Sequence, residues 1–151
     1  MGFALSEHRE ALSEQESAVL DFLLRPGQIE KEIRRKEHRI ETLRSMAGRK
    51  MPRLEKVRVQ STPDPTRMQT LLAMAADEEK EIRDLEAEME RAWEEIALAI
   101  SDIPDTLMIE LLDLRYLQYR NWDEIARELV YSQGWLHKLH RRALSLVRLP
   151  A

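Results

Sequence analysis

The residues of this chain whose types and spacing suggest chemistry are cations gathered near its carboxyl end. Between Ser132 and Arg148 the sequence has four Lys or Arg residues, two His residues and no Asp or Glu, although the whole chain has a formal net charge of −4. Helical spacing brings Lys138, Arg141 and Arg142 to one side of a helix. Because attraction to phosphates supplies much of the affinity in DNA binding, we expect this segment to contact double-stranded DNA.

We expect these contacts to divide between base edges and the phosphate backbone. Trp135 either touches a sugar or a thymine methyl group, or packs on a neighbouring helix, and the sequence leaves both open. His140 could also reach phosphates or base edges. The candidates for base contact are Gln133, His137, Lys138 and Arg141. The candidates for phosphate contact are Arg142, Arg115 and Arg120.

A pair of short helices must position these side chains, and the sequence after residue 120 predicts one. Asn121 and Ser132 are favoured N-cap residues, and Ala126 is small enough for the point where two helices cross. The apolar residues for the inner faces are Ile125, Leu129, Leu136 and Leu139. We therefore expect a helix-turn-helix whose second helix enters the DNA major groove.

Other kinds of site find little support in the sequence. His137 and His140 are three residues apart, a spacing that a metal ion accepts, but no nearby Cys, Asp or Glu completes a site. We find no glycine-rich phosphate loop and no nucleophile elbow. The ten acidic residues between Asp77 and Glu95 fit a solvated helix face. We expect no metal, no cofactor and no enzymatic activity.

Two long helices are predicted upstream, and the fold class that follows is all-α. Apolar residues recur at heptad spacing over about 28–47, if Lys36 is counted, and over about 66–101. The first of these segments has an excess of basic residues and the second an excess of acidic residues. We expect them to pair as a long antiparallel helical hairpin or coiled coil, and the sequence does not decide whether they pair within one chain or between chains.

Proline and glycine mark the predicted boundaries. Residues 25–27 (Arg-Pro-Gly) are expected to end a short helix that Ser13 caps. Residues 48–66 are rich in proline and basic residues, which predicts a flexible loop that either reaches DNA or is solvated. A further helix is expected at about 105–118. The predicted domains are a hairpin or coiled-coil part at 1–101, with the loop at 48–66, and a small helix-turn-helix domain at 104–149.

The composition limits the protein class. Charged residues make up 34% and aromatic residues 5%, a mixture that favours long solvated helices over a thick sheet core. The chain contains no cysteine, so disulfides and thiolate metal sites are excluded and a reducing cytoplasm is favoured. No apolar run approaches the roughly 20 residues of a membrane-spanning helix, and the amino terminus does not resemble a signal peptide. We expect a cytoplasmic protein without membrane contact.

Four segments carry a family resemblance: Leu114-Arg115-Tyr116-Leu117, residues 121–126, Tyr131-Ser132 and residues 139–144. They resemble the DNA-binding region four of bacterial sigma factors. With the long helices and the basic loop, the chain from about residue 17 onward is similar to phage and prophage helix-turn-helix proteins, the late transcriptional regulators of the ArpU and RinA type. One departure is Val130 in the turn, because a β-branched residue disfavours the left-handed backbone and predicts a wider turn.

The resemblance implies a phage-encoded, sequence-specific regulator of transcription that acts in a bacterial host cell. RNA polymerase is then a further candidate partner, and the long helices could form a homo-oligomer. One alternative is a small terminase subunit that recognises a DNA packaging site, which ring-sized oligomers would favour. Another is a protein-interaction module that docks on RNA polymerase, which would show no salt-dependent affinity for DNA.

Overall fold

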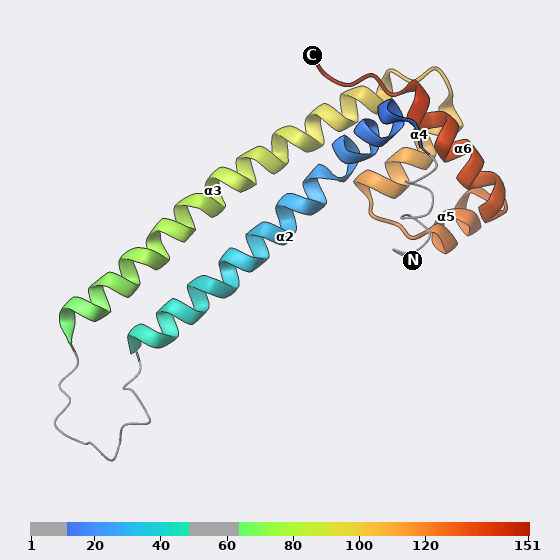
Figure 1. The fold of residues 1–151 in the computed structure, drawn as a ribbon. Helices are drawn as coiled ribbons and strands as arrows, with labels where there is room; N and C mark the ends of the chain where they lie inside the picture. The colour runs from blue at the N-terminus through green and yellow to red at the C-terminus, as the bar shows by residue number, and fades with distance from the viewer. Residues whose placement is uncertain (1–11, 49–63) are drawn as a thin grey trace. The chain divides into compact units, whose positions relative to one another are not determined.

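The computed structural model describes residues 12–48 and 64–151, and over these residues the protein is all-helical, as the sequence predicts. None of the described helices is long and apolar enough to cross a membrane. The elements in chain order are α2 (Glu14–Gly48), α3 (Pro65–Ser101), α4 (Thr106–Leu112), the π-helix η2 (Asp113–Leu117), α5 (Trp122–Leu129) and α6 (Gln133–Leu146) (Figure 1). They form two compact units: a hairpin unit, the described residues of Gly27–Met89, and a terminal unit, the described residues up to Pro26 together with Glu90–Ala151.

The hairpin unit confirms the predicted helical hairpin. Within it, α2 and α3 lie side by side and run in opposite directions (Figure 1). The heptad residues of both helices form one buried cluster: Ile29, Ile33, Ile40, Leu43, Ala75 and Ile82, with Leu71, Leu85 and Met89 partly buried against it. The hairpin therefore closes within a single chain.

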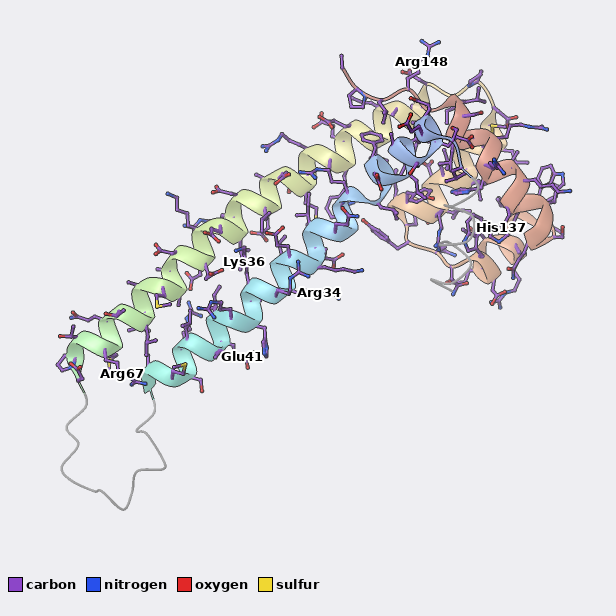
Figure 2. The ribbon with its side chains drawn as sticks, viewed as in Figure 1. Arg34, Lys36, Glu41, Arg67, His137 and Arg148 are labelled. Atoms are coloured by element: carbon purple, nitrogen blue, oxygen red, sulfur yellow. The ribbon has the colours of Figure 1, made fainter. Side chains whose placement is uncertain are left out.

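Lys36 occupies a heptad position of this hairpin and bonds across it. Its Nζ atom donates hydrogen bonds to Glu78 Oε2 at 3.2 Å and to Glu81 Oε2 at 2.5 Å. Figure 2 shows Lys36 on the side of α2 that faces α3. These hydrogen bonds, to Glu81 first and Glu78 second, raise the pKa of Lys36 above its ordinary value of 10.5. Lys36, a cation between the two helices, is thus paired with carboxylates of α3. This pairing favours the observed alignment of α2 with α3.

The predicted break at residues 25–27 is wrong, because α2 continues through Pro26. Proline lacks the N–H that would bond to the preceding turn, and this usually ends or kinks a helix. Pro26 is fully buried in the terminal unit, so its ring contributes apolar contact there. The start of the helix is as predicted: Ser13 Oγ accepts a hydrogen bond from the Glu16 N–H at 3.1 Å.

The predicted domain boundary at 101–104 differs from the observed division. The first turns of α2 and the last turns of α3 share one buried core with the helices that follow. Its largest fully buried side chains are Val19, Leu23, Ile96, Ile100, Leu111, Leu112, Ile125, Leu136 and Leu144. The predicted helix-turn-helix domain at 104–149 is therefore part of a larger terminal unit.

Most of the predicted basic loop at 48–66 lies outside the described residues. At its two margins the structure corrects the range: Gly48 belongs to α2, and α3 begins at Pro65. Asp64 Oδ1 accepts a hydrogen bond from the Thr66 N–H at 3.0 Å. Proline suits the first helical position because an N–H there would have no partner within the helix.

Replacing Lys36 by glutamine should lower the melting temperature at neutral pH but not at strongly alkaline pH. The folded-state pKa of Lys36 is above the unfolded value of 10.5, so the stabilisation is fully present below that pH. It is lost as the pH rises through the folded-state pKa. Thermal unfolding of both proteins from about pH 8 to about pH 12 measures this difference. Lys31→Gln, at an exposed position of α2, is the control, and a difference that does not shrink above pH 10.5 would contradict the pairing.

Candidate nucleic-acid interface

The first helix of the candidate interface, α5, begins with a complete capping box at Asn121. Asn121 Oδ1 accepts a hydrogen bond from the Glu124 N–H at 2.9 Å, and the Asn121 N–H donates to Glu124 Oε1 at 3.2 Å. Each side chain thus satisfies a backbone N–H that has no partner inside the helix. The predicted cap at Asn121 is confirmed.

The turn between α5 and α6 is tight, which corrects the wider turn that the sequence predicts. Val130 adopts the left-handed conformation, with φ 60° and ψ 49°. The Tyr131 N–H donates a hydrogen bond to the Ala126 carbonyl at 3.2 Å, which closes the end of α5. The Val130 side chain is 82% exposed, so no apolar burial offsets the strain of this conformation. The turn is therefore held by its backbone hydrogen bonds and by the packing of the two helices.

The second helix, α6, presents an apolar face to the terminal core. Ser132 caps it as predicted, since Ser132 Oγ accepts a hydrogen bond from the Trp135 N–H at 3.2 Å. The buried residues of this face are Leu136, Leu139, His140, Ala143 and Leu144. Of the predicted inner-face residues of α5, Ile125 is fully buried and Leu129 partly buried. This packing fixes which side of α6 is turned to solvent.

The opposite face of α6 carries the predicted cations. Lys138, Arg141 and Arg142 are exposed. Among the residues that the structure describes, none forms an ion pair with Lys138 or Arg142. No acidic residue occurs on α6 itself. This face is a cationic surface of the terminal unit, which we call the α6 outer face (Gly134, Lys138, Arg141, Arg142 and Ser145).

Arg141 differs from its two neighbours because it meets a carboxylate of α2. Its Nε atom lies 3.5 Å from Glu16 Oε2, and the side chains of Arg141 and Glu16 are 52% and 15% exposed. Ion pairs with an exposed partner contribute little to stability, so this contact does not rule out another partner for Arg141. A phosphate that binds Arg141 would nevertheless compete with Glu16.

Two predicted contact residues pack on the Trp122 ring. The Arg115 guanidinium lies 5.1 Å above the ring centre, and the His137 ring centre lies 4.3 Å from it. Both side chains are half-buried. Arg115 also donates a hydrogen bond from Nη1 to the Arg120 carbonyl at 3.1 Å. Arg115 and His137 therefore fix the local structure, and a DNA contact would use only their exposed atoms.

The structure corrects the role considered for His140, which is buried and not on the outer face. Its Nε2 atom is hydrogen-bonded to the Tyr116 hydroxyl at 2.6 Å, and the two rings stack with centres 5.7 Å apart. Burial raises the pKa of Tyr116 well above its ordinary value. The sequence offered one signal that was missed: His140 lies four residues after Leu136, on the apolar side of the helix.

The remaining predicted contact residues lie around the start of α6 and before α5. The Gln133 side chain is exposed and donates a hydrogen bond from Nε2 to Asp123 Oδ1. Trp135 is half exposed and stacks on Tyr131, with ring centres 4.4 Å apart. Arg120 Nη1 lies 3.9 Å from Glu128 Oε2. Trp135 thus adjoins the start of the outer face next to Gly134, whereas Gln133 and Arg120 each face a carboxylate of α5.

A hollow of about 340 Å³ lies elsewhere on the terminal unit. Its lining includes the carboxylates Glu110, Asp113 and Glu128, together with Leu114, Gln118 and Leu129. Burial first, and the charge of Glu110 second, raise the pKa of Asp113. A phosphate would be repelled there, so the hollow does not belong to a nucleic-acid interface.

Replacing Val130 by glycine should stabilise the protein by about 0.5–1 kcal/mol, because glycine adopts the left-handed conformation without a Cβ penalty. Chemical denaturation measures the free energy of unfolding. Val130→Ala is the control: it retains a Cβ and should gain less. A glycine variant no more stable than the alanine variant would show that the turn carries no such strain.

Tyr116→Phe should destabilise the protein by about 1–2 kcal/mol, because it removes a buried hydrogen-bond partner of His140. The matched variant is Tyr119→Phe, which removes, from a half-exposed residue, the hydroxyl that accepts a hydrogen bond from Trp93 Nε1 at 2.8 Å. That change should cost less than about 0.5 kcal/mol. If both variants lose the same free energy of unfolding in urea denaturation, the buried Tyr116–His140 hydrogen bond adds no more stability than the exposed one at Tyr119.

The chain matches no protein-family model, no curated protein and no solved structure. The resemblance to region four of sigma factors therefore stays a prediction from the residues. The features of the chain that bear on its function are the geometry of the α5–α6 pair and the cations of the α6 outer face.

Proposed function

We propose that the protein is a sequence-specific double-stranded DNA-binding regulator of transcription, encoded by a phage. One observation supports this above the others: the second helix of a tightly connected helix pair buries its apolar side and exposes Lys138, Arg141 and Arg142. That arrangement is the one by which helix-turn-helix proteins place a recognition helix in the major groove. No catalytic role enters the proposal.

The local charge favours this function although the chain is acidic overall. The net charge of −4 includes the many carboxylates of α3, ten of which lie between residues 77 and 95. Salt screens a charge within about 10 Å, so a phosphate at α6 responds to the nearest side chains more than to the total. Lys138 and Arg142 have no ion-pair partner among the described residues and are the cations most ready to contact phosphates.

The positions of the side chains refine the predicted roles. Gln133 and Lys138 lie in the first two turns of α6, where a recognition helix contacts base edges. Arg142 follows one turn later and suits a phosphate. Arg141 would take part by exchanging Glu16 for a phosphate, and Arg115 and His137 would support the helix pair through Trp122.

A second candidate function is docking on another protein. The candidate partner is RNA polymerase. The observation that favours it is a group of exposed apolar side chains at the turn: Val130, Tyr131 and Trp135. Such groups often mark contacts between proteins. The two functions differ in DNA affinity, because a protein that only docks on another protein would show no salt-dependent affinity for a duplex.

The test uses a duplex selected from a random pool by the wild-type protein. Changing Lys138 and Arg142 together to alanine should weaken binding to it and should reduce the slope of log K against log salt by about 2, since each phosphate contact contributes about 0.9. Fluorescence anisotropy at several salt concentrations gives both quantities.

The control carries the same loss of charge at Lys31 and Arg35, two exposed positions of α2 in the hairpin unit. This double alanine variant should bind the duplex as the wild type does. If both double variants bind the duplex equally weakly, the loss of affinity comes from the change in net charge and not from the contacts of α6. A wild-type protein that binds no duplex would favour the docking function.

A further inference from the structure

Gly134 lies in the first turn of α6, and nothing within the described chain requires a glycine there. No glycine of the described residues has a positive φ. Apart from its two neighbouring residues and the backbone of α6 itself, a Cβ at Gly134 would meet no described heavy atom within 4 Å. Glycine weakens a helix relative to alanine, because it has more backbone freedom to lose on folding. The glycine therefore lowers helix stability without serving the turn or the packing.

The place of Gly134 on α6 suggests what it serves. It is exposed, and it precedes Lys138 by four residues and Arg141 by seven, so the three lie along one side of the helix. It also adjoins Trp135, whose ring stacks on Tyr131. At its amino-terminal end, the α6 outer face thus exposes backbone without a side chain, at Gly134. Towards the carboxyl end it exposes Lys138 and Arg141.

We propose that Gly134 is the point of closest approach between the α6 backbone and a DNA base pair in the major groove. The inference rests on the proposed DNA-binding function and deepens it. A recognition helix touches base edges with its amino-terminal residues. Without a side chain at Gly134, the helix can lie deeper in the groove, where Lys138 reaches the base edges and Gln133 does so by exchanging Asp123 for a base. A side chain there would hold the helix away from the duplex.

The experiment compares Gly134→Ala and Gly134→Leu with the wild-type full chain on the selected duplex. The alanine variant should weaken binding about tenfold, and the leucine variant more, because the added atoms fill the space of a base edge. The slope of log K against log salt should stay unchanged, since no phosphate contact is removed. This separates the steric effect from the loss caused by changing Lys138 and Arg142.

Gly27→Ala is the matched control. Gly27 is also helical, and a Cβ there also meets no atom within 4 Å. Both alanine variants should raise the melting temperature by about 2–4 °C. Only the Gly134 variant should bind DNA less tightly. A protein that becomes more stable while losing affinity has lost a contact with the ligand and not its fold.

Three results would overturn the inference. If Gly134→Ala binds as the wild type while the Lys138 and Arg142 variant still binds weakly, the proposed function stands and the close approach is wrong. If Gly134→Ala lowers the melting temperature, the glycine has a structural role. If the wild-type protein binds no duplex, both the proposed function and this inference fail.

Discussion

The orientation of α6 depends on one interaction, the burial of its apolar face against α5 and the terminal core. Leu136 and Ile125 are fully buried there, and Leu144 is nearly so. Each such side chain contributes roughly 1.5–3 kcal/mol through removal from water, which is far more than an exposed ion pair contributes. This burial, and not any attraction between charges, turns Lys138 and Arg142 to solvent. Because the apolar face of α6 is packed against the core, its charged face is exposed to solvent. The proposed function depends on this exposed charged face.

Local features of the sequence predicted local structure well. The N-caps at Asn121 and Ser132 depend on hydrogen bonds within three residues, so the residue types are sufficient to identify them. The heptad pattern predicted both long helices and the residues that pair them, including Lys36, because helical periodicity alone decides which side of a helix is apolar. The outer face of α6 was predictable for the same reason.

Features that depend on distant residues were not predictable from the sequence. The chemistry of proline predicts a helix end at Pro26, yet α2 continues through this residue, which is buried in the terminal unit. The pairing of Glu16 with Arg141 joins residues far apart in sequence, and so do the core contacts that moved the domain boundary. Val130 is a further case. A β-branched residue disfavours the left-handed conformation, but the hydrogen bond from the Tyr131 N–H and the packing of the two helices override this preference. Tertiary context outweighs an intrinsic preference of about 1–2 kcal/mol.

We propose that the α6 outer face is the surface that contacts duplex DNA. An NMR titration of the full chain with the selected duplex, following backbone amide signals, tests it most directly. We expect the largest shifts at the amides of Gly134, Lys138 and Arg142 and little change at the amides of the hairpin unit. Shifts that are absent from α6, or that are confined to α2 and α3 of the hairpin unit, would contradict it.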